Sequence, residues 1–210
     1  DNTIIYWDLI AGTNSTFITT DNKIRCLAVS PQGRYIVVGT DDGKVIRYNI
    51  DNKDKTILFQ SDGNKIYAIA FNKGGSRIAF GDKNGNLRLM DTKTNTVVKT
   101  IPAHNAPIMD LEFSPDDRQI ATASTDKLLK IWEAGNLNNK PIVIQAHGSN
   151  FVLSVTFSPD GRFLVSSADQ KDLSKINYIY YWPTSAEYMA DMLCAKIERN
   201  FTQREWESYV

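Results

Sequence analysis

The sequence repeats itself with a period of 42 residues. Three segments align in register without a gap: IRCLAVSPQGRYIVVGTDDGKVIRYNI from Ile24, IYAIAFNKGGSRIAFGDKNGNLRLMDT from Ile66 and IMDLEFSPDDRQIATASTDKLLKIWEA from Ile108. A fourth copy, VLSVTFSPDGRFLVSSADQ, starts two residues late at Val152, and the opening DNTIIYWD matches the end of a copy. Such a period is typical of folds in which one structural unit stacks on the next.

Each copy consists of short runs of alternating apolar and polar residues, separated by turns rich in Gly, Asp and Asn. This alternation predicts short antiparallel strands. In the copy from Ile108 we expect them at 107–113, 118–124, 128–132 and 140–144. A four-stranded sheet built in this way is apolar on both faces, and it buries them only by stacking on neighbours around an axis. The sequence therefore predicts an all-β fold, a β-propeller segment of about four to five blades.

Recurring short motifs strengthen this prediction. They are Ala-His at 103–104 and 146–147, Phe-Ser-Pro-Asp at 113–116 and 157–160, and Trp-Asp or Trp-Glu at 7–8 and 132–133. With the period, they make residues 1–183 resemble WD40 repeats. The resemblance implies a partial first blade at 1–20 and blades at about 21–61, 62–102, 103–145 and 146–183. Seventeen expected strands are not a multiple of four, so we expect the segment to belong to a larger ring.

Ser124, His104 and Asp126 have the chemistry of a hydrolase triad. A catalytic serine needs an exposed site and an oxyanion hole, and neither these nor a G-x-S-x-G elbow is recognisable in the sequence. The WD40 resemblance implies instead a structural tetrad, a hydrogen-bonded chain that ties one blade together. The third complete copy offers His104, Ser124, Asp126 and Trp132. The fourth offers His147, Ser167, Asp169 and Trp182. Because the set occurs twice, we expect the structural role.

The two earlier copies lack a complete tetrad. The corresponding residues are Thr20, Thr40, Asp42 and Tyr48 in the copy from Ile24, and Asp62, Asp82, Asn84 and Met90 in the copy from Ile66. We expect these two blades to be held mainly by apolar packing and to be the less stable ones.

Positions that vary within the fixed repeat are free to serve binding. The resemblance implies that the start of each first strand lies near the top face of the propeller, where WD40 proteins commonly bind partners. The candidate residues are Lys23, Arg25, Lys65, Tyr67, Asn105, Met109, Phe151 and Leu153. Met109 and Leu153 could equally pack between blades. The insertion at 170–177 is either a binding loop or a tolerated surface loop.

Composition limits the partners. Basic and acidic residues number 24 each, so no overall attraction to nucleic acid or an anionic membrane is expected. The sequence has no apolar run long enough for a membrane span. Cys26 and Cys194 lie far apart without C-x-x-C spacing, which argues against a disulfide framework or a zinc site. We expect a cytoplasmic protein without a metal or cofactor.

The repeat ends after Trp182-Pro183. Thr184 with Glu187 reads as a capping box, and apolar residues then follow at helical spacing, which predicts a helical extension over 184–210 with a second helix from Thr202. The phrase LCAKIERNFTQREWESYV resembles the tail of bacterial proteins in which a WD40 propeller follows a signal-transduction NTPase domain of the STAND type. This resemblance implies a larger bacterial cytoplasmic regulator.

We therefore expect a non-enzymatic scaffold or sensor module that binds a protein, a peptide or upstream domains of its own polypeptide. Two chains could also close one ring as a homodimer. The first alternative is a propeller hydrolase with its site in the channel, which would need clustered histidines and carboxylates on the inner strands. The second is an autoinhibitory clamp on an upstream NTPase domain.

Overall fold

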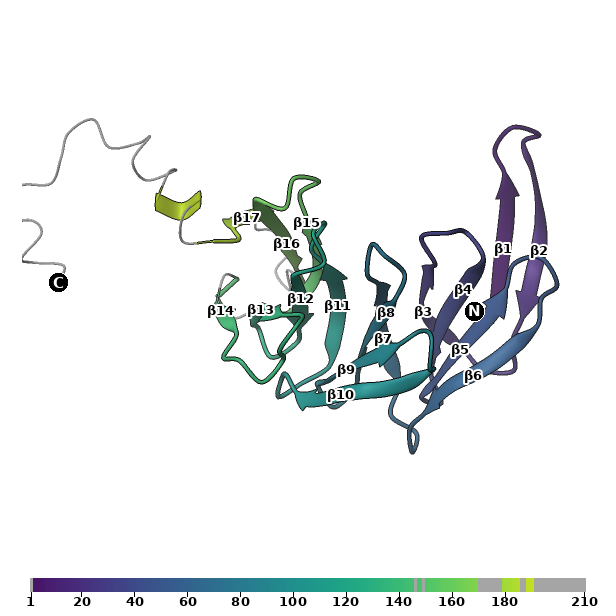
Figure 1. Ribbon diagram of the computed structural model, residues 1–210, viewed down its shortest axis with the longest axis horizontal. Coiled ribbons are helices and arrows are strands. Elements are labelled where there is room, and N and C mark those ends of the chain that lie inside the picture. Colours follow the sequence, from purple (N-terminus) through teal and green to yellow (C-terminus); the bar gives the residue numbers. More distant parts are fainter. Residues whose placement is uncertain (1, 146, 149, 170–178, 186–187, 191–210) are drawn as a thin grey trace, which may run out of the picture.

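The computed structural model describes residues 2–145, 147–148, 150–169, 179–185 and 188–190. Its strands form five antiparallel sheets, which lie side by side along an arc from the N-terminal strands to β17 (Figure 1). The expectation of an all-β fold made of blade-like sheets, part of a propeller, is confirmed.

The sheets follow the sequence copies in order. The N-terminal hairpin contains β1 (Thr3–Asp8) and β2 (Thr13–Thr19). Blade 1 contains β3 (Ile24–Val29), β4 (Tyr35–Thr40), β5 (Lys44–Asn49) and β6 (Lys55–Gln60). Blade 2 contains β7 (Ile66–Phe71), β8 (Arg77–Asp82), β9 (Asn86–Asp91) and β10 (Thr96–Pro102). Blade 3 contains β11 (Ile108–Phe113), β12 (Gln119–Ser124), β13 (Leu129–Glu133) and β14 (Ile142–Ile144). Blade 4 contains β15 (Val152–Phe157), β16 (Phe163–Ala168) and β17 (Tyr180–Pro183).

In blade 3 the first three strands lie within one residue of their expected bounds. The fourth, β14, begins at Ile142 rather than at residue 140. A turn closed by the Asn139 N–H and the Asn136 carbonyl, 3.0 Å apart, precedes it. Pro141 then has no N–H to donate to the neighbouring strand, so regular pairing starts only after it.

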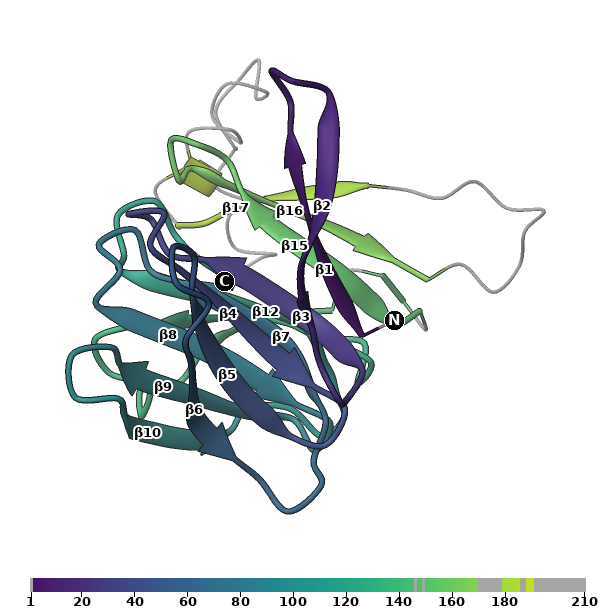
Figure 2. The ribbon, with the colours of Figure 1, turned by 90° about the vertical axis from the view of Figure 1, so that its right-hand side faces the viewer.

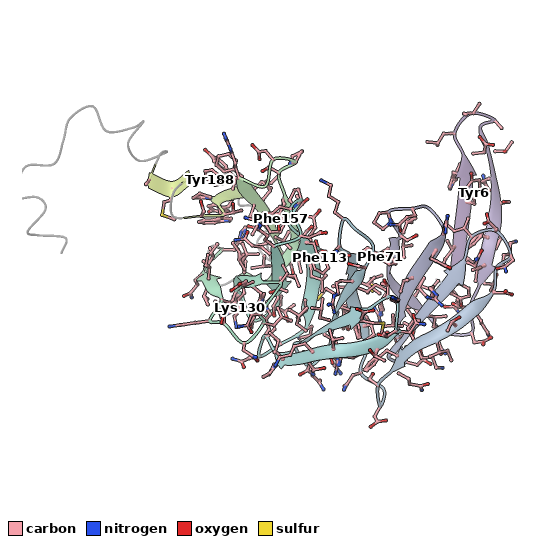
Figure 3. All side chains as sticks on the ribbon, viewed as in Figure 1. Tyr6, Phe71, Phe113, Lys130, Phe157 and Tyr188 are labelled. Atoms are coloured by element: carbon pink, nitrogen blue, oxygen red, sulfur yellow. The ribbon has the colours of Figure 1, made fainter. Side chains whose placement is uncertain are left out.

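Neighbouring blades are held together by apolar residues from the end of each first strand. The first such residue is Ile69, Leu111 or Val155, and these are only 8%, 3% and 3% exposed. The second is an aromatic residue, labelled in Figure 3, and it is Phe71, Phe113 or Phe157 in blades 2, 3 and 4. Each pair packs towards the preceding blade, so the core is a series of layers between sheets.

On the inner half of blade 1 the equivalent residues do not pack against a preceding sheet within the described residues. Leu27 and Val29, which are equivalent to Ile69 and Phe71, are 50% and 52% exposed. The N-terminal hairpin covers the outer half, where Ile4 packs with Tyr48 and its neighbours. Viewed from this end of the arc, the tip of the hairpin projects beyond blade 1 (Figure 2). Trp7 is 58% exposed on β1.

Two glycines allow blades to approach closely. A Cβ atom at Gly39 would lie 2.6 Å from Cγ2 of Ile66, and one at Gly81 would lie 2.7 Å from Cβ of Ile108. In both places the first isoleucine of the next blade sits on the glycine of the preceding second strand. Because Cβ of Ile108 cannot move independently of the backbone, the 2.7 Å distance leaves no room for a methyl group at Gly81.

We expect Gly81→Ala to lower the free energy of unfolding by about 1–3 kcal/mol, because the added methyl group forces blades 2 and 3 apart. Gly135→Ala is the matched control, since a Cβ there would meet nothing within 4 Å. Urea denaturation of both variants measures the difference. Equal midpoints for the two variants would show that the blade contact tolerates the extra volume.

The contacts between blades 2 and 3 and between blades 3 and 4 each have their own polar tie. At the lower end of blades 2 and 3, Asp117 accepts hydrogen bonds from the Lys73 and Gly74 N–H groups, at 2.7 and 3.2 Å. Asp117 has a φ of 62°, in the position that is glycine in the other copies. Between blades 3 and 4, Asp110 accepts from the Val155 N–H at 2.9 Å and Glu112 from the Phe157 N–H at 2.7 Å.

The described part of the tail differs from the expected capping box. The Tyr188 N–H donates to the Ser185 hydroxyl at 3.2 Å, so Ser185 rather than Thr184 caps the helical turn. Thr184 instead donates its hydroxyl hydrogen towards the Gly161 carbonyl at 2.6 Å, which fixes the chain to blade 4. Glu187, the insertion at 170–177 and the helix from Thr202 lie outside the described residues. No helix in the described part of the chain is long and apolar enough to cross a membrane.

Candidate functional site

The top face is the end of the blades where each first strand begins. It consists of the loops before the first strands and the turns between the second and third strands. One backbone hydrogen bond recurs there in all four blades and joins the loop to the turn. The bonds run from Asp41 N to Lys23 O (2.9 Å), from Lys83 N to Lys65 O (2.9 Å), from Thr125 N to Pro107 O (3.2 Å) and from Asp169 N to Phe151 O (2.9 Å).

A β-bulge recurs at the second residue of every first strand. Ile24 pairs with Thr40, but the next paired residue is Cys26, so that Arg25 is skipped. The skipped residues in the other blades are Tyr67, Met109 and Leu153. A bulge frees one residue from the strand ladder and re-aims its side chain. These four bulge residues are the variable ones that the sequence singled out as top-face candidates.

Arg25, Asp41, Lys65 and Tyr67 form a cluster that bridges blades 1 and 2. Arg25 Nε lies 2.5 Å from Asp41 Oδ1, and Lys65 Nζ lies 2.9 Å from Asp41 Oδ2. The Arg25 guanidinium lies over the Tyr67 ring, 5.4 Å from its centroid. The hydrogen bonds from Lys65 and Arg25 lower the pKa of the Asp41 carboxyl, so it is ionised at neutral pH. The cluster therefore holds two cations and an aromatic ring in one fixed arrangement.

The remaining candidates lie along the same face. Lys23 and Asn105 are exposed, Met109 and Phe151 are partly buried, and Leu153 is 38% exposed. Asp41 was not among the candidates that the sequence analysis singled out. A signal was present, because the equivalent residue varies between the copies: it is Asp41, Lys83, Thr125 or Asp169. The contact to Lys65 crosses blades and cannot be read from one copy alone.

In blade 3 the structure brings His104, Asp126 and Trp132 together, but the hydroxyl between them belongs to Thr122, not to Ser124. Trp132 Nε1 donates to Thr122 Oγ1 at 3.0 Å, and Thr122 Oγ1 lies 2.8 Å from His104 Nε2. His104 Nδ1 lies 2.9 Å from Asp126 Oδ2. The expected place of Ser124 in the tetrad is wrong.

The strand register explains this correction. Trp132 pairs with Ile120, so Thr122 is its diagonal neighbour, whereas Ser124 lies two residues further along β12. A diagonal neighbour is within reach of a large aromatic side chain, and a residue about 13 Å along the strand is not. Ser124 instead donates to the Ala106 carbonyl at 3.2 Å and accepts from the Asp126 N–H at 3.0 Å.

The chain itself carried a signal for Thr122. The equivalent residues in blades 1 and 2 are Val38 and Phe80, and the residues at the Trp132 position there are Tyr48 and Met90. The hydroxyl and the indole therefore occur together and are lost together.

Blade 4 shows the same correction. His147 Nε2 lies 2.8 Å from Ser166 Oγ, which also accepts from Trp182 Nε1 at 3.1 Å. Ser167 faces the opposite side of β16, because successive residues of a strand alternate. Asp169 is the blade 4 equivalent of Thr125, and its N–H makes the recurring top-face hydrogen bond. Within the described residues no hydrogen bond joins Asp169 to His147. The expected places of Ser167 and Asp169 are therefore wrong.

Protonation in the blade 3 network follows from its partners. Burial lowers the pKa of His104, although the Asp126 carboxylate acts in the opposite direction. Burial alone would raise the pKa of Asp126, but hydrogen bonds from His104 and from the Asn105 and Leu128 N–H groups lower it to about 2. A neutral imidazole then donates from Nδ1 to the carboxylate and accepts the Thr122 hydroxyl hydrogen at Nε2.

This geometry does not fit a hydrolase triad. The acceptor nitrogen of His104 faces Thr122, whose hydroxyl also accepts the Trp132 indole N–H. The His104 side chain is fully buried, so a substrate carbonyl cannot reach the hydroxyl. The arrangement satisfies polar groups inside the blade and offers no nucleophile.

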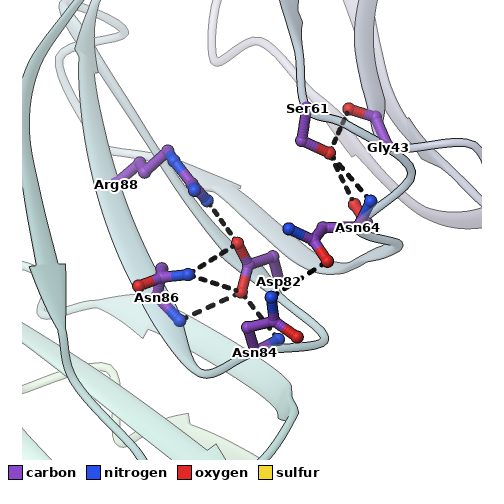
Figure 4. Close-up of polar contacts among 7 residues, drawn as sticks. All are labelled: Gly43, Ser61, Asn64, Asp82, Asn84, Asn86 and Arg88. Carbon is purple, nitrogen blue, oxygen red and sulfur yellow. Dashed lines mark hydrogen bonds and ion pairs between the residues drawn. The ribbon is translucent and has the colours of Figure 1, made fainter.

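Blade 2 has a different polar network in place of the tetrad (Figure 4). Asp82 is fully buried and its Oδ2 lies 2.6 Å from Arg88 Nη1, whose side chain is 12% exposed. The Asp82 carboxylate also accepts hydrogen bonds from the Asn84 and Asn86 N–H groups at 2.9 and 3.0 Å. The guanidinium of Arg88 lies over the Phe59 ring at 4.9 Å. The expectation that blade 2 is held mainly by apolar packing is therefore incomplete.

The Asp82 network reaches the top face. Asp82 fixes the backbone of Asn84, and Asn84 Nδ2 donates to Asn64 Oδ1 at 3.0 Å. Ser61 accepts the Asn64 N–H at 3.1 Å (Figure 4). Lys65 follows directly after Asn64. The buried ion pair thus holds the loop that carries one cation of the Arg25–Lys65 cluster.

A groove of about 700 Å³ lies elsewhere, on the lower outer side of blades 2 and 3. Three of its four charged side chains, those of Arg77, Asp91 and Asp117, already have partners. Arg77 Nη1 lies 3.7 Å from Asp91 Oδ2, and Asp117 binds the turn of blade 2. This groove therefore offers less for polar recognition than the top face does.

The described residues contain no cluster of His, Cys, Asp and Glu that could hold a metal ion. Cys26 is a free thiol, and burial raises its pKa to about 12. It is therefore not a reactive nucleophile near neutral pH.

The repeated four-stranded sheets and the His–hydroxyl–Trp networks define the class of protein: a β-propeller built from WD40 repeats. Residues 19–171 match the family model described as Vps8 beta-propeller. The chain belongs to this family.

Curated relatives are WD-repeat proteins. WD repeat-containing protein SL1-17 of Schistosoma mansoni is 31% identical over 134 residues, which are 63% of this chain and 44% of the relative. An uncharacterized WD repeat-containing protein, sll1491 of Synechocystis, is 27% identical over 69% of this chain and 41% of its own length. Target of rapamycin complex subunit wat1 of Schizosaccharomyces pombe is 22% identical over 79% of this chain and 53% of its own length. The matches thus span about half of these relatives or less.

Proposed function

We propose that this chain is a non-enzymatic binding module that captures a protein or peptide partner on its top face. WD40 propellers are typically protein-interaction scaffolds, and the Schizosaccharomyces pombe relative is by its name a subunit of a complex. The observation that carries the proposal is the cluster of Arg25, Asp41, Lys65 and Tyr67, which joins two blades. Arginine and tyrosine are also the residue types enriched in interface hot spots.

Rigid display is the proposed mechanism. The recurring bulges present one variable residue from each blade, on strands that are packed at both sides in blades 2 and 3. A binding surface that is already ordered loses little conformational entropy when a partner docks. Arg25 and Lys65 are oriented by the same carboxylate, so they do not have to be fixed on binding.

The setting of the module is part of the proposal. The uncovered inner half of blade 1 supports membership of a larger ring, completed by other residues of the polypeptide or by a second copy. The resemblance of the C-terminal tail supports a place in a bacterial cytoplasmic regulator after an NTPase domain. In such a protein the partner could also be an upstream domain, bound to the same face as an autoinhibitory clamp.

Comparative capture tests the proposal. The wild-type chain is immobilised and exposed to a lysate of cells that naturally produce this protein. We expect it to retain a partner that the double variant Arg25→Glu/Tyr67→Ala does not retain. Arg25 is exposed and Tyr67 is only partly buried, so the melting temperature should change little. The control is Lys73→Glu, which makes an equal charge reversal at one residue of an exposed lower turn. Quantitative mass spectrometry compares the retained proteins. Retention of the same partner by the double variant would place the binding surface elsewhere.

A further inference from the structure

We propose that the top-face site takes a peptide segment of defined polarity: an acidic side chain at blades 1 and 2, followed by an apolar side chain towards blades 3 and 4. This inference rests on the proposed function and adds the chemistry of the partner. It follows from the hydrogen-bonding capacity left on Arg25 and Lys65 and from the order of residues around the arc.

Arg25 is prepared for a carboxylate. Only its Nε is used, by Asp41 at 2.5 Å, and within the described structure its two terminal amino groups make no hydrogen bond. The Tyr67 ring supports the guanidinium plane. An arginine fork recognises a carboxylate through two parallel hydrogen bonds, and a guanidinium that is already oriented loses less freedom in forming them.

The cations around Arg25 outnumber the carboxylates. Lys65 Nζ has three N–H donors, and Asp41 accepts one of them. Lys23 and Lys83 are exposed in the same loops and turns, and neither forms an ion pair among the described residues. The exposed carboxylates of these loops are Asp21 and Asp62. Asp42, in the same turn as Asp41, pairs with Lys44 at 2.5 Å. With Asp41 and this pair included, five cations face four anions.

At the other end of the face the bulge residues are apolar. The four bulge residues lie on first strands that contact one another in sequence, from β3 to β7, β11 and β15. Their order is therefore a cation, an aromatic ring and two apolar side chains: Arg25, Tyr67, Met109 and Leu153. Phe151 precedes β15 at the same end. An extended segment across these strands would meet the cations of blades 1 and 2 first and the apolar side chains of blades 3 and 4 afterwards.

A selection experiment tests this polarity. The full 210-residue chain is used to select binders from a display library of random dodecapeptides, in parallel with Arg25→Gln/Lys65→Gln and with the lower-turn control Lys73→Gln. We expect wild type and control to enrich peptides in which Asp or Glu lies at a fixed spacing from an apolar residue and always on the same side of it. The double variant should select peptides at the acidic frequency of the library. Selected peptides should bind it roughly tenfold or more weakly, since charge-assisted hydrogen bonds are lost.

Salt provides a second readout that needs no variant. Binding of the selected peptides should weaken by about tenfold between roughly 0.05 and 0.5 M NaCl, because exposed charges are screened. If wild type selects apolar peptides without acidic enrichment, and they still depend on Tyr67, the acidic chemistry is wrong while the proposed function stands. If the peptides bind Arg25→Glu/Tyr67→Ala as well as wild type, the top-face function itself fails.

Discussion

Replacing Arg88 by methionine is expected to lower the free energy of unfolding by about 3–5 kcal/mol, the range for removing one partner of a buried ion pair. The variant keeps an unbranched, flexible side chain but leaves the Asp82 carboxylate fully buried without its countercharge. The two backbone N–H groups that Asp82 accepts do not replace a full positive charge. Guanidinium chloride denaturation measures the change.

Arg118→Met is the matched control for this experiment. Its guanidinium Nε lies 3.7 Å from Asp116 Oδ2, but the two side chains are 85% and 59% exposed. An ion pair in water contributes about 0–1 kcal/mol, so the control should unfold nearly as wild type does. Equal losses in both variants would mean that Asp82 is stabilised by its hydrogen bonds alone.

The second large effect is expected for Thr122→Val, which has the shape of threonine but lacks the hydroxyl. His104 Nε2 and the Trp132 indole N–H would both lose their partner while remaining buried. Each unsatisfied buried group costs about 1–3 kcal/mol, so the two together should cost about 2–6 kcal/mol. Thermal and urea unfolding check the value.

Two further variants give this prediction its contrast. Thr122→Ser keeps the hydroxyl and should recover most of the loss. Ser124→Ala should cost only about 1 kcal/mol, because it removes local bonds to the Ala106 carbonyl and the Asp126 N–H. A larger loss for Ser124→Ala than for Thr122→Val would return Ser124 to the centre of the network.

The arrangement of strands could be predicted from the sequence because the residues that determine it lie close together in the chain and recur in several copies. Alternation and turn residues determine each strand, and the repeat allows one copy to correct another. The start of β14 was missed because Pro141 and the preceding Asn136–Asn139 turn delay the pairing within one copy only.

The site was less accessible, since it depends on contacts between strands and between blades. Choosing Thr122 over Ser124 requires the register of β12 against β13. A difference of two positions along β12 determines which hydroxyl the Trp132 indole can reach. The role of Asp41 requires Lys65, which belongs to the next blade. Blade 2 can bury Asp82 because Arg88 pairs with it. This ion pair could not be predicted from the fact that the copy lacks the histidine and tryptophan of a tetrad.

The polar ties between blades bear on how a repetitive chain avoids assembling in the wrong order. Copies that resemble one another can pair with the wrong neighbour during folding, a characteristic failure of repeat proteins. Here Asp41 with Lys65, Asp117 with the turn of blade 2, and Asp110 with Ser154 and Val155 each occur at a single junction. An exchanged blade would keep its apolar packing but lose its own tie. These carboxylates therefore make each junction specific, and they favour the correct order of blades among sheets that are otherwise nearly interchangeable.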